Sequence, residues 1–509
     1  MIPLLTRRLS RVDVRRAERL TGLQWLRTIG CVTRTTVKRP LEHRPTLRLT
    51  AMLLLVWSGT IAGAAQEAAP QPLALNAAVD LALRNHPGVH EAQAGARAAS
   101  REIGVARAAY LPRLDFLWQV NRATRNNVFG LLLPQPVIPA VSGPVLGTEA
   151  LDGVWSTAGG LLLSWEAIDF GRRSASVDVA RADSHFAAAQ REVAELEIAS
   201  AAANAYLEVV AADAALRAVR ANVDRLEVFA KTVRTLVANQ LRAGAEQSRA
   251  EAELAAARNR LIEAQRNVDI ARLALAEAIG VPTTAVAVDP GSLLEVPATP
   301  PVAAFDVASH PRAAAANAQA DEVRARDRAL ERSYFPRVEL QSAVAGRGVN
   351  RDVEGNPSGL GLTVPNWAIG LTVTFPSFEI FRTEARRRVE AERLQEASAH
   401  YDRTLQVLQA QEARARVVMT AALQIAGNTP QQLQAARDAD TQARARYDAG
   451  LTTALEVAEA QRLLADAESA NAVASLGVWR ALLAEAVVKG DLKPFLDQVR
   501  APHASRISQ

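Results

Sequence analysis

Cysteine is nearly absent from this 509-residue chain, whose single copy, Cys31, lies in the stretch 1–65. An internal disulfide is therefore excluded, and removal of that segment would also exclude a thiolate nucleophile or a cysteine-bound metal. Histidines are few, and His86 and His310 lie in repeated His-Pro dipeptides with no neighbouring side chains that complete a catalytic or metal-binding arrangement. We therefore expect no enzyme activity, cofactor or metal site, and expect these histidines to cap or pack helices.

Aromatic residues are scarce, at 5 %, whereas alanine runs are frequent, as in 201–219. Such a composition favours long, closely packed helices over thick globular cores. From Arg172 to Ala243 there is neither glycine nor proline, and at 1.5 Å per residue this stretch could form a helix on the order of 105 Å long. In the second half, Gly-Asn-Thr-Pro at 427–430 interrupts the matching stretch, and we expect it to kink or break the helix.

Positive charge is concentrated in residues 1–65, which hold twelve basic and three acidic residues, so the rest of the chain is net acidic although the whole carries +5. The basic character therefore gives no reason to expect a nucleic-acid partner. Two arginines precede an apolar run from Leu49 to Ile61, and small residues follow up to Ala65. This pattern predicts a secretory leader over residues 1–65. The alternative, a membrane anchor, needs about 20 apolar residues, and a lipid on Cys31 is a second alternative.

The remainder of the chain contains an internal duplication. Residues 85–116 match 309–340 at an offset of 224, with His86, Pro87, Tyr110, Pro112 and Arg113 aligned with His310, Pro311, Tyr334, Pro336 and Arg337. Residues 163–173 match 373–383 at an offset of only 210. The loop that connects the two strands is therefore longer in the first copy than in the second, by the difference between the two offsets. Gly244 aligns with Gly450 at an offset of 206, which predicts a deletion of four residues, about one helical turn, just after Gly244.

Each copy is predicted to contain a helix, two strands, a very long helix, a turn and another helix. The first repeat is expected over residues 66–290 and the second over 291–495. Residues 496–509 are expected to form a disordered tail. The predicted protomer is thus mainly α, with four strands contributed by two repeats.

The predicted strands alternate between apolar and polar residues, most clearly at 367–375. Period two with one apolar face indicates a sheet between two different media. One interpretation is that the two media are the core of a soluble protein and water. Strands of about 10 residues, bounded by aromatics and joined by long loops, favour a membrane sheet instead. The candidate girdle aromatics are Trp118, Trp155, Trp165, Trp367 and Phe375.

Four strands are too few to close a membrane barrel, and an open edge in lipid would leave backbone groups unpaired. Oligomerisation is therefore expected. Two copies would give eight strands and a filled interior, whereas three would give twelve and a wider one.

A coiled-coil pattern occupies the helix expected after residue 244. Large apolar residues recur every seven positions, with alanines interleaved between them, which predicts a closely packed seam. The members are Leu254, Leu261, Val268, Leu275, Ala257, Ala264, Ala271 and Ala278, with Leu464, Ala467, Ala474, Val478 and Ala481 in the second copy.

Residues 73–88, 107–116 and 446–461, together with the duplication, resemble the outer-membrane efflux protein family typified by TolC. The resemblance implies a homotrimer with a twelve-stranded transmembrane β-barrel continued by an α-helical barrel across the periplasm of a Gram-negative bacterium. It further implies a periplasmic adaptor, an inner-membrane pump of the RND or ABC type, and outer-membrane lipid as partners.

The same resemblance assigns roles at the expected helical tips. Glu456 and Glu459 follow Gly450 by six and nine positions, as do the acidic residues that form rings at the family's periplasmic entrance. A solvated helix face is the alternative for these two glutamates. The turns expected to contact the adaptor contain Gly244 and Ala245 in the first copy and Gly450, Leu451, Thr452 and Thr453 in the second.

The function predicted is a passive outer-membrane duct of a tripartite efflux or type I secretion system. The sequence leaves open the exported cargo and the open or closed state of the tip. The alternative from another class is a periplasmic coiled-coil adaptor, although adaptors lack both the whole-length duplication and the four strands.

Overall fold

The computed structural model describes residues 72–124, 153–282, 286–297, 306–349 and 360–500. By its internal contacts the chain divides into two units, Met1–Glu67 and Ala68–Gln509. All of the described residues lie in the second unit. The expected leader, its cleavage site and most of both strand-connecting loops therefore lie outside the described residues.

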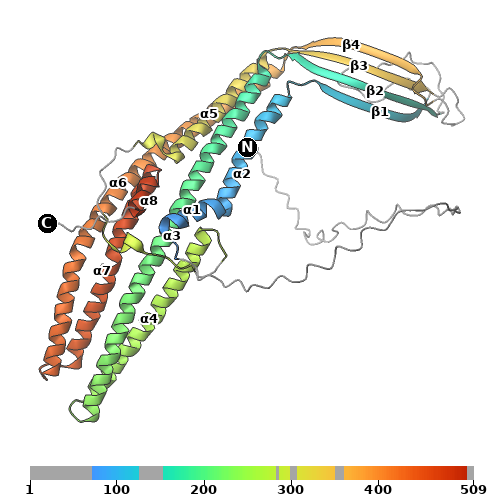
Figure 1. Ribbon diagram of the computed structural model, residues 1–509. Coiled ribbons are helices and arrows are strands. Elements are labelled where there is room, and N and C mark those ends of the chain that lie inside the picture. The colour runs from blue at the N-terminus through green and yellow to red at the C-terminus, as the bar shows by residue number, and fades with distance from the viewer. Residues whose placement is uncertain (1–71, 125–152, 283–285, 298–305, 350–359, 501–509) are drawn as a thin grey trace, which may run out of the picture. The chain divides into compact units, whose positions relative to one another are not determined.

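The first repeat begins with two short helices and ends with a long helical hairpin (Figure 1). Its elements are α1 (Leu75–Asn85), α2 (Pro87–Ala108), β1 (Arg113–Thr124), β2 (Gly153–Ile168), α3 (Arg172–Ala238) and α4 (Gly244–Ala278). At 67 residues α3 has the length that its lack of glycine and proline predicts, and ends shortly before Ala243.

The second repeat has the same order, with short 3-10 turns before and after its first helix. Its elements are η1 (Gly291–Leu294), η2 (Val307–Ser309), α5 (Pro311–Glu331), η3 (Arg332–Tyr334), β3 (Arg337–Val349), β4 (Val364–Thr374), α6 (Glu379–Asp448), α7 (Ala454–Lys489) and α8 (Lys493–Arg500). The last helix, α8, runs to Arg500 and its Phe495 is buried. The expectation of disorder from residue 496 is therefore wrong for 496–500, and 501–509 lie outside the described residues.

The two repeats keep one offset around the turns of the two long hairpins. The helices α3 and α6 end at Ala238 and Asp448, and α4 and α7 begin at Gly244 and Ala454, so both pairs keep the offset of 210. The four-residue deletion expected after Gly244 is therefore wrong. It followed from pairing two glycines that do not occupy equivalent positions.

The helix α6 continues without a break through Pro430, over all of Glu379–Asp448. A break at 427–430 is therefore wrong, and a kink there stays a prediction. Proline removes one intrahelical hydrogen bond, but Ala426 and Thr429 beside it are buried, and Ala426 packs against Ala474 and Val478 of α7. Packing along a 70-residue helix outweighs the cost of a proline inside it, which is about 3 kcal/mol because the ring also crowds the preceding turn.

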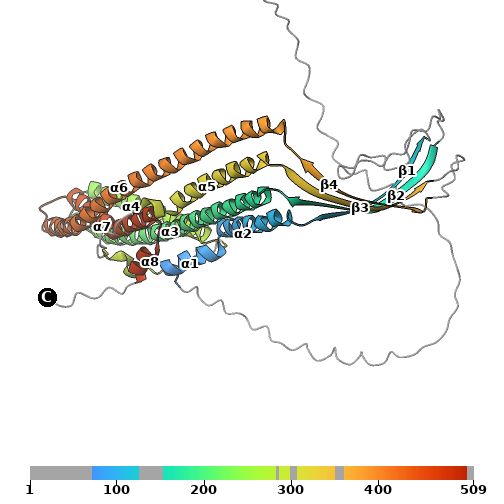
Figure 2. The same cartoon turned by 90° about the horizontal axis from the view of Figure 1, so that it is seen from above.

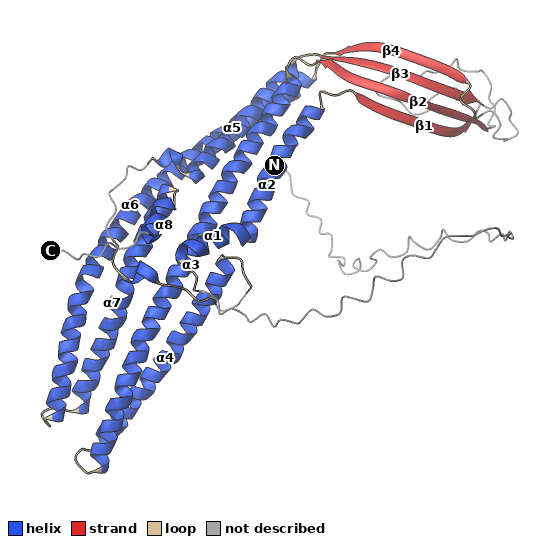
Figure 3. Cartoon of the chain, viewed as in Figure 1, coloured by secondary structure: helices blue, strands red, loops and turns tan. Residues whose placement is uncertain are grey.

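Helices α2, α3, α5 and α6 lie side by side in that order, and the strands extend from their ends (Figures 1 and 2). The strands form a four-stranded antiparallel sheet in the order β1-β2-β3-β4 (Figure 3). Among the described residues, its outer strands, β1 and β4, pair on one side only. The sheet therefore has two open edges within one protomer.

A row of large apolar residues crosses the whole sheet on one face. Phe116 pairs with Leu161, Leu161 with Val344, and Val344 with Trp367. These side chains are exposed by 72 %, 48 %, 63 % and 78 %. The opposite face carries polar residues, among them Gln341 and the paired Glu166 and Glu339. The alternation expected from the sequence is confirmed, and the apolar face has no cover from described helices.

The main hydrophobic core lies where the short helices meet the long hairpins. Leu75 and Val79 of α1, Tyr206 of α3, Leu275 of α4 and Trp479 of α7 are all buried there. By length and composition α7 could cross a membrane, but its apolar window is 56 % buried. Packing in this core accounts for its apolar character. The seam leucines and alanines predicted in α4 and α7 are buried or partly buried, which confirms the coiled-coil pattern.

The repeated His-Pro dipeptides begin α2 and α5. His86 Nδ1 accepts from Gly88 N at 3.1 Å, and His310 Nδ1 accepts from Arg312 N at 3.0 Å, so both cap helices as expected. A Cβ atom at Gly490 would come within 2.6 Å of Pro311 Cδ. The glycine that ends α7 thus permits the close approach of the second dipeptide.

Candidate functional site

The two long hairpins turn through the same backbone geometry. At the end of α6, Gly450 has φ +76, and its N–H bonds to Tyr447 O at 3.0 Å. At the end of α3, Gln240 has φ +64, and its N–H bonds to Val237 O at 2.9 Å. Gln240 is therefore the counterpart of Gly450. Glutamine rarely adopts positive φ, so the sequence offered no signal for this position.

The predicted tip residues occupy two different structural positions. Gly244 and Ala245 form the exposed first turn of α4, after the reversal of the chain, so the expectation of Gly244 as a turn glycine is wrong. Leu451 and Thr453 are exposed at the second turn, whereas Thr452 is buried. Leu241 is exposed at the position equivalent to Leu451. Each hairpin thus presents one exposed leucine at its tip.

Glu456 and Glu459 lie in the first two turns of α7 and are both exposed, while Val457 and Ala458 between them are buried. Arg446 Nη1 approaches Glu456 Oε2 at 4.0 Å, the outer limit of an ion pair. Among the described residues, Glu459 forms no ion pair. Glu456 and Glu459 thus place two carboxylates on one face of α7 beside the second tip, as their three-residue spacing predicts.

A cluster that the sequence did not predict joins the two hairpins just behind the tips. Tyr447 of α6 is buried and donates from its hydroxyl to Glu246 Oε2 of α4 at 3.1 Å. Arg242 donates to Tyr447 O at 2.8 Å, and its guanidinium lies 4.6 Å from the centre of the tyrosine ring. Phe229 of α3 packs edge-on against that ring at 5.5 Å.

Burial and the neighbouring Glu246 carboxylate raise the pKa of Tyr447 to about 12. The phenol therefore stays protonated and remains a donor across the physiological pH range. A second link lies further from the tips, where Arg225 of α3 makes two contacts with Glu468 of α7, at 2.7 and 3.3 Å. Arg480 of α7 also pairs with Glu208 of α3, further still from the tips. Polar contacts thus hold the hairpins together at several levels.

The candidate girdle aromatics fall at two levels of the sheet. The register places Trp118 opposite Gly159, near the loop end that also carries Trp155 and Trp367. Trp165 pairs with Leu340 near the helix end, where Phe375 directly follows β4. Trp155 is half-buried and the other four are exposed. Trp165 Nε1 donates to Tyr110 O at 3.0 Å, which keeps its polar atom paired.

An open sheet with an exposed apolar face, continued by paired helical hairpins, is the arrangement of a membrane channel protein. Residues 78–281 and 307–484 match the model of the outer membrane efflux protein family. The chain belongs to this family.

Curated relatives and solved structures agree with this assignment. The chain is 28 % identical over 349 residues to the pyoverdine export outer membrane protein OpmQ of Pseudomonas aeruginosa, covering 66 % of this chain and 72 % of OpmQ. Its fold is similar to that of the outer-membrane channel OprN, with a TM-score of 0.64, 21 % identity and coverage of 82 % and 89 %. For the Campylobacter jejuni CmeC outer membrane channel the TM-score is 0.66, with 18 % identity and coverage of 82 % and 85 %.

The protein is an outer-membrane efflux channel of a Gram-negative bacterium, with its helical part in the periplasm. Family and fold are those of channels rather than enzymes.

Proposed function

We propose that three copies of this chain close one conduit that passively carries cargo from a periplasmic adaptor and an inner-membrane pump across the outer membrane. The observation that supports this is the open sheet: in the part of the chain that the structure describes, β1 and β4 each lack a partner on one side, while apolar side chains cover one face. In lipid, each unpaired backbone group would cost several kcal/mol. Pairing β4 of one copy with β1 of the next removes every edge.

Three copies suit this sheet better than two. Eight strands give a barrel filled by its own side chains, whereas twelve leave space inside. The polar face would then line a water-filled interior, and the apolar face would meet lipid. The aromatics at the two levels, Trp118, Trp155 and Trp367 on one and Trp165 and Phe375 on the other, would lie at the two membrane surfaces.

The helical hairpins would continue the wall through the periplasm. In this proposal the exposed tips at Gly244, Ala245, Leu451 and Thr453 contact the adaptor. Glu456 and Glu459 from three copies would gather six carboxylates at the entrance and favour cations there. Because the wall is shared and passive, the pump selects the cargo. OpmQ is a pyoverdine exporter by name, and drug, metal-ion and protein export all fit a conduit of this kind.

Single-channel recording in planar bilayers tests the proposal. The mature full-length protein, reconstituted from detergent, should give discrete conductance steps, and boiling before reconstitution should abolish them. A protein that remains soluble without detergent and gives no steps would instead fit a periplasmic adaptor.

A further inference from the structure

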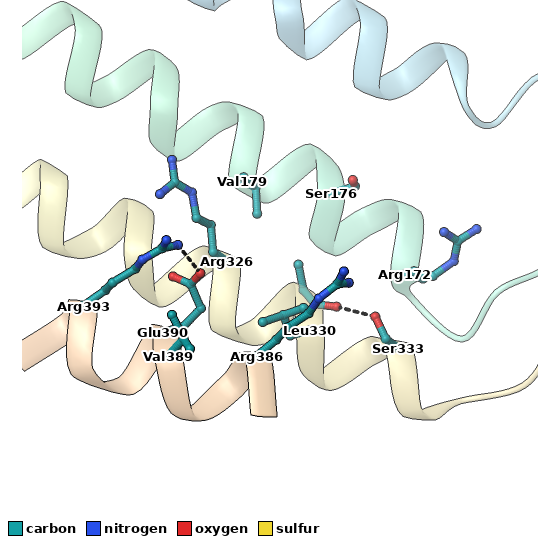
Figure 4. Close-up of a pocket in the computed structure, with 11 residues that line it drawn as sticks. Arg172, Ser176, Val179, Arg326, Leu330, Ser333, Arg386, Val389, Glu390 and Arg393 are labelled. Atoms are coloured by element: carbon teal, nitrogen blue, oxygen red, sulfur yellow. Dashed lines mark hydrogen bonds and ion pairs between the residues drawn. The ribbon is translucent and has the colours of Figure 1, made fainter. Parts of the chain in front are cut away.

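Four arginines surround a cavity of about 590 Å³ between α3, α5 and α6 (Figure 4). They are Arg172, Arg326, Arg386 and Arg393, and the cavity lining contains one carboxylate, Glu390. A second cavity of about 590 Å³ continues along α5 and α6, shares Arg326 and Arg393, and adds Arg403, His400 and one carboxylate, Glu396. We call the two together the arginine groove.

Three of these arginines are held in place by carboxylates. Arg393 Nη1 lies 2.7 Å from Glu390 Oε1, Arg326 pairs with Glu322, and Arg172 pairs with Glu166. Each of these contacts uses one nitrogen of the guanidinium. Because a guanidinium has five N–H donors, the others remain available. Arg386 forms no ion pair with any described residue. The groove therefore keeps N–H donors that the described residues leave unpaired, on three arginines held by an ion pair and on the exposed Arg386.

The ion pair of Arg172 with Glu166 shows which side of the wall the groove faces. Glu166 pairs with Glu339, and Glu339 with Thr372, across the polar face of the sheet. Ser176 and Val179 lie on the same face of α3 as Arg172, at spacings of four and seven residues, and line the same cavity. In the proposed trimer this face lines the conduit, so any role of the groove in transport rests on the proposed function.

We propose that the arginine groove is a transit site for oxyanions, carboxylate or phosphate groups borne by the exported molecule or free in solution. Guanidinium groups match the planar geometry of carboxylates and the oxygens of phosphate through paired N–H donors. The neighbouring carboxylates offset part of the positive charge and keep binding weak. A conduit needs such a site to bind strongly enough to attract an anion and weakly enough to release it.

The groove would also give the conduit two charge filters of opposite sign. Glu456 and Glu459 lie beside the tip where α6 ends, whereas Arg393 lies near the start of α6, at the other end of that helix. An anion that passes the acidic entrance would next meet cationic side chains just before the barrel. The cargo class that this arrangement favours is a molecule with both cationic and anionic groups.

Two substitutions test the assignment. Arg386→Gln removes the unpaired guanidinium without breaking an ion pair. Arg388→Gln, two residues away, removes the same charge from an arginine outside the cavity lining that pairs with Glu384 at 3.3 Å. In bilayers, millimolar inorganic phosphate should lower the potassium chloride conductance of the native protein and of Arg388→Gln. In Arg386→Gln the phosphate concentration for half effect should rise about tenfold, the value of one charge-assisted hydrogen bond. Phenyl phosphate, used in place of inorganic phosphate, tests whether the groove also binds a phosphate group that an organic molecule carries.

Phosphorus-31 line broadening in detergent gives a readout that needs no conducting channel. Native protein and Arg388→Gln should broaden the phosphate signal, and Arg386→Gln should broaden it far less. Equal behaviour of the two variants, or no broadening by the native protein, would overturn the oxyanion site. Conductance steps whose size does not change with phosphate would overturn this site while leaving the channel function intact.

Discussion

The hydroxyl of Tyr447 on α6 lies 3.1 Å from Glu246 Oε2 on α4, so a hydrogen bond joins the two helical hairpins next to their tips, beside the one that Arg242 donates to Tyr447 O. The tyrosine ring is buried between Phe229 and the Arg242 guanidinium. Hydrogen bonds to charged groups are worth roughly 1.5–3 kcal/mol. A contact of that size can hold the hairpins together and still be broken by a docking partner, because a protein interface supplies several times that energy.

Tyr447→Phe should loosen the tips while keeping the aromatic packing. The hydrogen bond to Glu246 is lost, and the carboxylate is left with Arg242 alone at 3.9 Å. If separation of the hairpins widens the entrance, we expect single-channel conductance to rise severalfold and amide exchange in 240–250 and 445–455 to accelerate.

Tyr401→Phe is the matched control for that substitution. Tyr401 lies in the same helix α6, and its hydroxyl has no hydrogen-bond partner among the described residues. Conductance should match that of the native channel. An equal rise in both variants would assign the effect to general loosening of α6 and remove Tyr447 from the closure of the tip.

Replacing both Glu456 and Glu459 with glutamine should reduce the preference for cations without preventing assembly. Both side chains are exposed, so the change costs little stability. Reversal potentials across a potassium chloride gradient measure the preference. Glu263→Gln, at an exposed position of α4, should leave it unchanged. A double variant with native selectivity would favour a solvated helix face over an entrance ring.

Gln461→Leu should stabilise the hairpins. Gln461 is 1 % exposed, and neither side-chain polar atom has a hydrogen-bond partner among the described residues. A buried unsatisfied polar group costs about 1–3 kcal/mol, so leucine should raise the free energy of unfolding by a similar amount. Thermal unfolding followed by helical circular dichroism measures this. Gln434→Leu, at an exposed position, should change it by less than about 0.5 kcal/mol. A lower melting temperature for Gln461→Leu would mean that the amide finds partners in the assembled channel.

Stability should fall in mildly acidic solution through His310. Burial lowers the pKa of His310, and its Nδ1 accepts from Arg312 N while Nε2 lies 3.2 Å from Val487 O. The folded state therefore favours the neutral ring. Its contribution is complete above the unfolded pKa of about 6.5 and is lost as the pH falls toward and through the lower folded value. His310→Asn keeps a capping acceptor and should flatten the decline between pH 7 and 5, measured by chemical unfolding. An unchanged slope would assign the decline to other groups.

Periodicity predicted the sheet and the hairpins well because one face of a strand repeats every two residues and the seam of a helical hairpin about every 3.5. The apolar face containing Trp367 and the seam containing Leu254 and Leu275 each follow from one repeating spacing, and the structure places them as expected. The internal duplication also predicted the order of the helices and strands, because each copy repeats the same pattern.

Local backbone signals were less informative. Pro430 predicted a break that packing against α7 overrides. Gly244 predicted a turn that Gln240 makes instead, since the turn requires positive φ rather than glycine itself. Pairing by glycine alone therefore misplaced the first tip by about one helical turn.

Contacts between distant segments could not be predicted from spacing. Tyr447 and Glu246 are 201 residues apart, and Arg172, Arg326 and Arg386 come from three helices. Only the packing of the hairpins and of α3, α5 and α6 brings these side chains together.

The subunit count in detergent tests the central claim most directly. Native mass spectrometry of the mature protein, extracted from membranes, should give a particle of three copies, because twelve strands close a sheet that four leave open. A monomer that stays in solution after the detergent is removed would contradict the account.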